Sequence, residues 1–182
     1  MKNEQVDILV IGAGPSGAMA GAMTNKSGLR VKIIEKTKFP RFVIGESLLT
    51  RCMDHFEEAG VLEELKKHNF QVKNGAIFLK GEQRCEFNFA EQFTKGKEWT
   101  WQAPRDQFDK VIADTVESMG VDIDYESEVT DIQFNGTNST TIVKDKRGVE
   151  KKIEAKFIID ASGYGRVIPK LLDLNYPSTQ PN

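Results

Sequence analysis

The stretch Val6-Asp-Ile-Leu-Val-Ile-Gly-Ala-Gly-Pro-Ser-Gly17 decides the fold. Its first six residues are nearly all apolar and mostly β-branched or aliphatic, which is typical of a central parallel strand covered on both faces. A glycine-rich turn follows at once, and small residues continue it as a helix that ends near Gly28. Residues 31–34 then form a second apolar strand, so the segment predicts a βαβ unit.

The glycines of the turn have separate physical roles. Gly12 allows the sharp turn, Gly14 lets a pyrophosphate approach the backbone, and Gly17 lets the helix pack closely on the strand. The first turn of the helix offers amide hydrogens and a partial positive charge to phosphate groups. The turn therefore predicts a dinucleotide-binding loop, and the alternative is a glycine turn in an α/β unit that binds nothing.

An acidic residue at the end of the second strand completes the fingerprint. Glu35 follows Gly17 by 18 residues, where a carboxylate accepts hydrogen bonds from ribose hydroxyls and repels the 2′-phosphate of NADP. The candidate cofactor-binding residues of this βαβ unit are Gly12, Gly14, Pro15, Ser16, Gly17, Glu35 and Lys36.

The rest of the chain mixes helices and strands. Apolar spacing predicts helices over 49–59, 61–65 and 108–119, with a short one over 167–172. Strands are expected over 77–79, 87–89, 99–102, 121–125 and 153–159. Of these, 77–79 and 87–89 are expected in a sheet with one face exposed to solvent. A turn rich in Asn and Gly predicts a hairpin of 129–134 with 141–144.

Composition excludes several classes of protein. The 182 residues carry a formal net charge of −2, so no basic field indicates nucleic acid. Two cysteines without a CxxC motif indicate a reducing compartment, and no signal sequence is recognised, so we expect a cytoplasmic protein. His55 and His68 lack partners at ligand spacing, so no metal is expected.

Four later motifs carry a family resemblance. They are Phe39-Pro-Arg-Phe-Val-Ile-Gly-Glu-Ser-Leu48, Lys73-Asn-Gly-Ala76, Gln102-Ala-Pro-Arg-Asp-Gln-Phe-Asp109 and Ile158-Ile-Asp-Ala-Ser-Gly163. In order and approximate spacing they resemble the superfamily of flavin-dependent halogenases, geranylgeranyl-reductase-like enzymes and FAD monooxygenases. The resemblance covers essentially the whole chain and implies FAD as the cofactor, without fixing one reaction.

The resemblance also implies roles for individual residues. Arg41 would lie along the cofactor, Gly45, Glu46 and Ser47 near the ribityl chain and flavin ring, and Gln102 and Arg105 at the ribityl chain and phosphates. Val129 would meet the adenine through its backbone, and Asp160, Ala161 and Gly163 would close over the adenosine end. Taken alone, the two arginines fit surface salt bridges, Glu46 a structural carboxylate, and Asp160 a turn-forming residue.

Two departures from the family bear on the reaction. Trp99-Thr-Trp101 imitates the Trp-x-Trp-x-Ile-Pro element of halogenases but lies far too early, so we interpret both tryptophans as packing residues. Lys73 matches the stretch that holds the catalytic lysine of phenolic halogenases and is the candidate catalytic residue. The Gly-Asp motif that contacts the flavin end in the family has no match, so we expect a truncated chain that lacks the C-terminal half of the family fold.

The predicted fold is α/β, an FAD/NAD(P)-binding Rossmann-like three-layer fold. Its parallel sheet is joined by a β-hairpin or meander layer and a partial inserted antiparallel sheet. Residues 1–182 would form an FAD-binding domain with a discontinuous core of about 1–45 and 100–175. A substrate-side insert would begin at about 46–99.

The predicted function is that of an FAD-binding oxidoreductase, first a dehydrogenase or reductase that passes hydride between FAD and an organic substrate. The alternatives are a monooxygenase or halogenase that uses O₂, and a fragment that binds a nucleotide without catalysis. The expected partners are a small organic substrate and an electron donor, either NAD(P)H or a reductase. A lipid substrate or peripheral membrane contact stays open.

Overall fold

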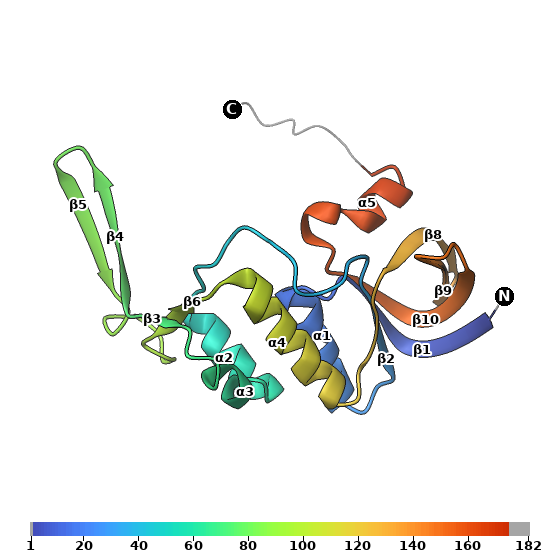
Figure 1. The fold of residues 1–182 in the computed structure, drawn as a ribbon, viewed down its shortest axis with the longest axis horizontal. Coiled ribbons are helices and arrows are strands. Elements are labelled where there is room, and N and C mark those ends of the chain that lie inside the picture. The colour runs from blue at the N-terminus through green and yellow to red at the C-terminus, as the bar shows by residue number, and fades with distance from the viewer. Residues whose placement is uncertain (1, 175–182) are drawn as a thin grey trace. The chain divides into compact units, whose positions relative to one another are not determined.

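In the computed structural model, which describes residues 2–174, the chain forms two compact units (Figure 1). Unit 1 combines the chain up to Lys38 with the chain from Val116 onward, and unit 2 comprises Phe39–Thr115. Unit 1 contains β1 (Lys2–Ile11), α1 (Pro15–Lys26), β2 (Val31–Ile34), β7 (Asp122–Asp124), β8 (Ser127–Asn135), β9 (Asn138–Asp145), β10 (Glu150–Asp160), the 3₁₀ turn η1 (Gly163–Gly165) and α5 (Val167–Leu171). Unit 2 contains α2 (Thr50–Ala59), α3 (Leu62–Lys66), β3 (Gln71–Lys73), β4 (Gly75–Lys80), β5 (Gln83–Asn88), β6 (Thr100–Gln102) and the greater part of α4 (Arg105–Ser118).

Unit 1 is built on one six-stranded sheet. The strand order is β7-β2-β1-β10-β9-β8. The first four strands are parallel, and β10, β9 and β8 are joined as an antiparallel meander. The predicted parallel sheet and hairpin are thus confirmed, and the hairpin continues the same sheet through β10. This is the Rossmann-like α/β arrangement predicted from the sequence.

The burial of β1 and β2 explains why they lie in the middle of the parallel part. All four residues of β2 are buried, as are Leu9, Val10 and Ile11 of β1, so both faces of these strands are covered. Helix α1 lies close to β2 at Gly21: a Cβ there would lie 2.8 Å from Cδ1 of Ile33, so any larger residue would require the Ile33 side chain to move. The small residues of α1 thus set the depth of the helix on the sheet.

A second apolar layer joins the meander to the parallel strands. Side chains of β1 and β2, including Ile11 and Ile34, form one buried cluster with Val129, Val143 and Ile153 from the meander. The β8–β9–β10 part of the sheet curls, as Figure 1 shows. Residues of α5 pack against the same cluster, so the C-terminal part of unit 1 is tied to its hydrophobic core.

Unit 1 also buries Lys32, a charged residue in the otherwise apolar strand β2. The Lys32 side chain is only 4% exposed, and its Nζ lies 3.0 Å from Glu4, 2.5 Å from Asp122 and 3.2 Å from Asp124. Lys151 contacts Asp124 as well. Burial, and next the charge of Lys32, lowers the pKa of Lys151 below its usual value. Three carboxylates around Lys32 offset the cost of removing its charge from water.

Unit 2 packs its helices around aromatic side chains. Phe70 contacts Phe108 of α4 and Trp101 of β6, with ring centroids 5.8 Å and 5.9 Å apart, and Phe56 of α2 contacts Phe108 at 5.7 Å. Trp101 is buried and also contacts Trp99, which agrees with a packing role for both tryptophans. Strand β3 pairs antiparallel with β6, and Lys73 lies at the end of this short strand.

The β4–β5 hairpin departs from its prediction. The two strands pair antiparallel, but both of their faces are exposed, with Phe78 and Phe87 61% and 53% accessible. The expectation of one covered face is wrong for the described residues, because no layer of unit 2 packs on the hairpin. Figure 1 shows it as an isolated two-stranded ribbon beyond β3 and β6.

Candidate functional site

The glycine turn of unit 1 is shaped by contacts that leave no space for side chains. Gly12 has a φ of +95°, and its amide donates to the carbonyl of Ile34 at 2.8 Å. A Cβ on Gly12 would lie 2.8 Å from the carbonyl oxygen of Ala161, and a Cβ on Gly17 would lie 1.8 Å from the oxygen of Gly12. Both glycines are therefore required by close approach of backbone to backbone.

The first turn of α1 is open to an anion. Gly14 precedes the helix in an extended conformation, Pro15 occupies its first turn, and Ser16 is exposed. Across the described residues, no side chain caps this turn and none of its own residues is acidic. Because amides at the start of a helix lack intrahelical acceptors, those of Ser16 and Gly17 suit a phosphate oxygen.

Glu35 holds the glycine turn in place. Its buried carboxylate accepts hydrogen bonds from the amide of Ala13 at 2.8 Å, the amide of Thr37 at 2.9 Å and the hydroxyl of Thr37 at 2.6 Å. The side chain therefore links the end of β2 to the turn. Its predicted contact with ribose stays a prediction, but the structure brings Glu35 to the loop as that prediction requires.

The end of β10 closes against the same turn. The Ala161 amide donates to the carbonyl of Ile11 at 2.9 Å, next to Gly12. The Asp160 carboxylate accepts from the amides of Ser162 at 3.0 Å and Ile168 at 2.9 Å, so it shapes its own turn and the start of α5. Asp160 is thus a turn-forming residue in this structure. Gly163 follows with a φ of +57°.

Two further predicted residues of unit 1 lie on or next to β8. Val129 is buried on this edge strand, beside a register shift between Val129 and Asp131. An edge strand leaves alternate backbone groups without a ladder partner, which a ligand can use. Lys36 forms an ion pair with Glu128 of β8 at 2.6 Å. Their contacts with a cofactor stay predictions.

In unit 2, two of the predicted arginines meet on one acid. Asp109 is 1% exposed and accepts from Nε and Nη2 of Arg105 at 2.7 Å and 3.0 Å, while Nη2 of Arg41 lies 3.8 Å away. Arg41 also stacks over the ring of Phe39, with 4.8 Å to its centroid. The sequence indicated no role for Asp109, because the helix predicted there began only at residue 108. In α4, which begins at Arg105, the two residues are four positions apart and can pair on one face.

The segment that follows Arg41 runs along β6. The Ala103 amide donates to the carbonyl of Glu46 at 2.9 Å, and the Leu48 amide donates to the carbonyl of Trp101 at 3.1 Å. The Gln102 side chain reaches the Glu46 carboxylate at 3.4 Å, and Lys73 donates to the hydroxyl of Ser47. Unit 2 therefore gathers its predicted site residues, which are Arg41, Gly45, Glu46, Ser47, Lys73, Gln102 and Arg105.

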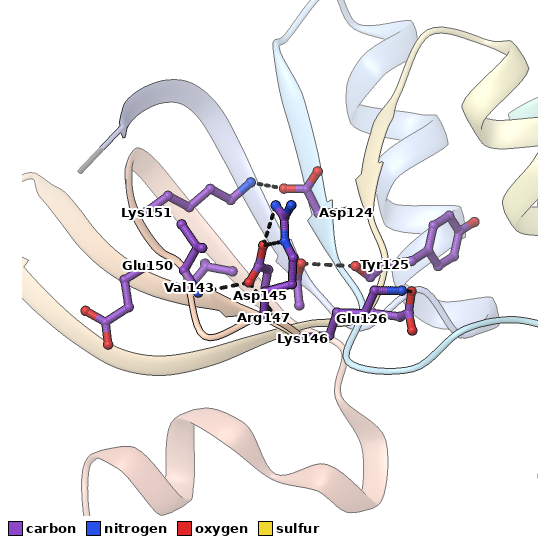
Figure 2. A pocket seen from close by; sticks show the side chains of 11 residues that line it. Asp124, Tyr125, Glu126, Val143, Asp145, Lys146, Arg147, Glu150 and Lys151 are labelled. Atoms are coloured by element: carbon purple, nitrogen blue, oxygen red, sulfur yellow. Dashed lines mark hydrogen bonds and ion pairs between the residues drawn. The ribbon is translucent and has the colours of Figure 1, made fainter.

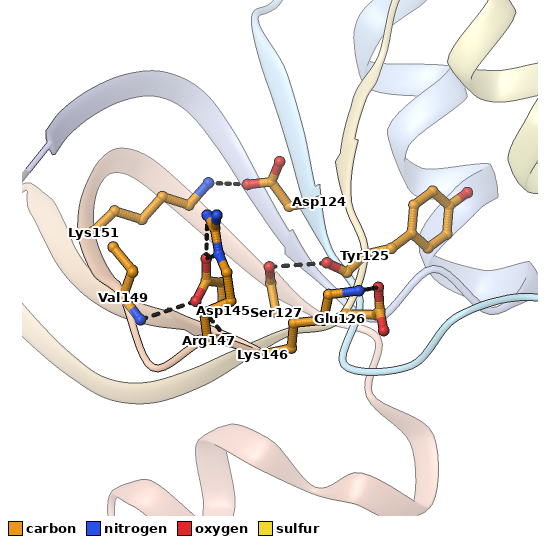
Figure 3. Close-up of polar contacts among 9 residues, drawn as sticks. All are labelled: Asp124, Tyr125, Glu126, Ser127, Asp145, Lys146, Arg147, Val149 and Lys151. Carbon is orange, nitrogen blue, oxygen red and sulfur yellow. Dashed lines mark hydrogen bonds and ion pairs between the residues drawn. The ribbon is translucent and has the colours of Figure 1, made fainter.

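An open pocket of unit 1 contains none of the predicted site residues. It lies where β7, β8, β9 and β10 meet (Figure 2). Its charges pair internally: Lys151 with Asp124, Lys146 with Glu126 at 2.7 Å, and Arg147 with Asp145 at 3.0 Å (Figure 3). These ion pairs join the ends of the strands around the pocket, and we assign no ligand to it.

Other functional chemistry has little support in the described part of the chain. Cys52 and Cys85 are free thiols. Residues 2–174 contain no grouping of three His, Cys, Asp or Glu side chains that could hold a metal ion. None of their helices has the length and apolar character needed to cross a bilayer.

The fold and the glycine turn of unit 1 define the class as a dinucleotide-binding α/β domain. The sequence matches the FAD binding domain family over residues 5–182, and the chain belongs to this family. It corresponds to the N-terminal portion of the superfamily of flavin-dependent halogenases and FAD monooxygenases, and its cofactor is FAD.

Known relatives share this portion. The chain is 30% identical to tryptophan 2-halogenase of Chondromyces crocatus over 158 residues, which is 86% of the chain and 30% of that protein. It is 27% identical to the 1H-pyrrole-2-carbonyl-[peptidyl-carrier protein] chlorinase of Pseudomonas fluorescens, covering 96% of the chain and 43% of that protein. The crystal structure of a flavoprotein/dehydrogenase from Cytophaga hutchinsonii is 57% identical, with a TM-score of 0.93, over 98% of this chain and 44% of that one. The chain thus spans less than half the length of each.

Proposed function

We propose that this chain is the FAD-holding portion of an FAD-dependent oxidoreductase. The observation that carries the proposal is the first turn of α1, which no described side chain caps and which follows a turn too tight for side chains at Gly12 and Gly17. A diphosphate fits such a turn because the helix terminus supplies both donors and partial positive charge. When bound, FAD supplies the redox chemistry, and the protein supplies position and electrostatics.

The proposed residue roles fall into two groups, one in unit 1 and one in unit 2. In unit 1, the glycine turn would hold the diphosphate, Glu35 and Lys36 the ribose side, Val129 the adenine, and the Asp160–Gly163 turn the adenosine end. In unit 2, the cofactor contacts would come from Arg41, Gly45, Glu46, Ser47, Gln102 and Arg105. The internal contacts described above support these groupings, because each group is held in place by the fold.

Halogenation or hydroxylation with O₂ is the first candidate reaction. The sequence alone favoured a dehydrogenase, but the relatives named for their activity favour the halogenase or monooxygenase alternative. The 57% identical flavoprotein/dehydrogenase keeps hydride transfer as the second candidate. Lys73 is the candidate catalytic residue for halogenation, and its contact with Ser47 supports a defined orientation of the amine.

The partners belong to the same proposal. One relative is named for a pyrrole held on a carrier protein, so a small organic substrate, free or carrier-bound, is the expected class. The electron donor would be NAD(P)H or a separate reductase. Two free thiols favour a reducing compartment such as the cytoplasm.

A charge placed in the first turn of α1 tests the cofactor site. Ser16→Asp adds a carboxylate that interacts favourably with the helix terminus, so the fold is kept while a bound diphosphate is repelled. We expect its Kd for FAD to rise about tenfold or more, since a repulsion of roughly 1.4 kcal/mol corresponds to a tenfold change. Flavin fluorescence titration of the purified chain measures this, and thermal unfolding checks the fold.

Ser16→Ala is the matched control, because it removes the same hydroxyl without adding charge. It should bind FAD as the parent chain does. ADP should displace FAD, whereas FMN, which lacks the adenylate, should not. Equal binding of FMN and FAD, or equal affinity of Ser16→Asp and the parent, would contradict the proposal. A chain that binds ADP alone would support the alternative of a nucleotide-binding fragment.

A further inference from the structure

Asp109 is a fully enclosed carboxylate on α4, with a side chain that is 0% exposed. Burying such a charge costs free energy unless hydrogen bonds and opposite charge replace water. Arg105 supplies two bonds in a fork, from Nε at 2.7 Å and Nη2 at 3.0 Å, and Arg41 lies 3.8 Å away. A bidentate pair fixes the plane of the guanidinium as well as its position.

The third nitrogen of Arg105 reaches the chain after Arg41. Nη1 donates to the carbonyl oxygens of Gly45 at 3.2 Å and Ile44 at 3.4 Å. Because the guanidinium is planar and rigid, the bonds to Asp109 decide where Nη1 points. Gly45 has a φ of +104°, so its carbonyl is presented by a backbone conformation that other residues rarely adopt.

Hydrophobic burial does not hold this part of unit 2. From Arg41 to Thr50 the described structure buries no residue, and Phe42 and Ile44 are 85% and 82% exposed. The segment is held by polar contacts instead. Residues 46–49 bond to β6 and its neighbours through the backbone bonds of Glu46 and Leu48 and through the side chains of Gln102, Lys73 and Thr100. Arg105 donates to the carbonyl oxygens of Ile44 and Gly45, at the start of this stretch.

We propose that Asp109 is a positioning residue that fixes residues 44–48 through Arg105 and keeps this segment in the form that binds FAD. The part of the inference that concerns the cofactor rests on the proposed function. Asp109 itself need not touch the cofactor. Its role is to orient the guanidinium that holds the carbonyls of Ile44 and Gly45.

Amide hydrogen exchange tests the positioning without any cofactor. In Asp109→Asn the side chain keeps its size but loses its charge, so Arg105 is held less firmly. The amides of Leu48 and Ala103, which bond across the segment and β6, should exchange about tenfold faster than in the parent chain. Asp114→Asn is the matched control, since Asp114 pairs with Lys110 at 2.6 Å on the same helix but on the exposed surface. Its exchange should be unchanged.

Nucleotide binding tests the second part of the proposal, the effect of Asp109 on FAD binding. Asp109→Asn should raise the Kd for FAD about tenfold while the Kd for ADP, held by the glycine turn of unit 1, stays unchanged. Arg105→Lys keeps the charge but loses the planar fork, so it should weaken FAD binding to a similar extent. Retained ADP binding shows that unit 1 of a variant is folded, and unchanged exchange of the Val61 amide, which donates to the carbonyl of Phe56 in α2, shows the same for unit 2. A purely structural role for Asp109 in the packing of unit 2 would speed the exchange of Val61 as well.

The outcomes separate the two claims. Unchanged exchange of Leu48 and Ala103 in both Asp109→Asn and Arg105→Lys overturns the positioning role. Faster exchange with unchanged FAD affinity, or an equal loss of FAD and ADP, overturns the link to the cofactor. If the parent chain takes up neither nucleotide, the proposed function fails, and the exchange experiment still decides the positioning role.

Discussion

The Gly12–Gly17 turn of unit 1 is shaped mainly by close approach of backbone to backbone, with the Glu35 carboxylate as an added acceptor. The segment after Arg41 in unit 2 depends on side-chain contacts in addition to its backbone bonds to β6. In the turn, a Cβ on Gly17 would overlap the Gly12 carbonyl. In the segment, a guanidinium oriented by a buried carboxylate holds two carbonyl oxygens. The first arrangement excludes all side chains at its key positions, and the second depends on which side chain is present.

The difference has a consequence for sensitivity to substitution. A turn defined by close approach should fail as a unit, because steric overlap with backbone cannot be relieved by a rotamer change. A segment defined by a charge pair should lose its order gradually, since its remaining backbone bonds persist. The two regions should therefore respond differently in stability and in ligand affinity.

Gly17→Ala should have the largest effect. Its Cβ would lie 1.8 Å from the Gly12 oxygen, so the turn and the start of α1 must move apart. We expect a loss of about 3 kcal/mol in the free energy of unfolding, together with loss of FAD binding. Denaturant titration and flavin fluorescence measure the two effects.

Gly136→Ala separates steric overlap from backbone strain. Gly136 has a φ of +67°, but nothing lies within 4 Å of a Cβ placed there. This variant should lose only about 1 kcal/mol, the cost of a left-handed conformation for alanine. Equal losses for Gly17→Ala and Gly136→Ala would mean that close approach does not define the turn.

Glu35→Ala should have an intermediate effect, because the Glu35 carboxylate accepts a hydrogen bond from the turn at Ala13. The substitution removes the acceptor of the buried Ala13 amide and the Oε1 acceptor that the amide and hydroxyl of Thr37 share. An unsatisfied buried donor costs about 1–3 kcal/mol, so a loss of about 2 kcal/mol is expected in denaturant titration.

Thr37→Val provides the comparison for Glu35. It removes only the hydroxyl that donates to the carboxylate at 2.6 Å and keeps the shape of the side chain. A loss of about 1 kcal/mol or less is expected. Should the two variants be equally stable, the carboxylate is not what joins β2 to the turn.

The same contrast explains what could be predicted from the sequence. The glycine turn and β1 were predicted because local spacing carries the information: an apolar strand, three glycines and a helix of small residues. The burial of Lys32 could not be predicted in this way. Its partners Glu4, Asp122 and Asp124 come from β1 and β7, and the pairing of these strands with β2 is set by the whole sheet. The β4–β5 prediction was wrong because alternation of residue types cannot say whether another layer covers a face.

The role of Asp109 lies between these cases. Arg105 and Asp109 have the spacing of a pair on one face of a helix. The burial of Asp109, however, depends on aromatic residues of unit 2 that are distant in the sequence, such as Phe56 and Phe70. A helical pair on the surface contributes little, whereas a buried one fixes geometry. Sequence spacing alone does not separate Arg105–Asp109 from the exposed pair Lys110–Asp114.

The smallest effect is expected where a partly exposed carboxylate fixes a turn at the surface. Asp145, the last residue of β9, accepts from the amides of Arg147 and Val149, each at 2.9 Å, and pairs with the Arg147 guanidinium (Figure 3). The Val149 amide, followed by the Arg147 side chain, holds the pKa of Asp145 below its usual value of 3.8. A carboxyl whose pKa is lower in the folded state stabilises the fold above its unfolded pKa, and this contribution is lost as the pH falls through the folded pKa.

Asp145→Asn tests this sign. The variant should be slightly less stable than the parent at neutral pH, and the difference should shrink as the pH falls below 3.8, the unperturbed pKa. Urea unfolding of both proteins over this range gives the difference directly, because effects shared by the other carboxyl groups cancel. A difference that stays constant or grows on acidification would show that the charge of Asp145 does not hold the turn. Side-chain fixation would then matter only where the carboxylate is buried, as it is at Asp109.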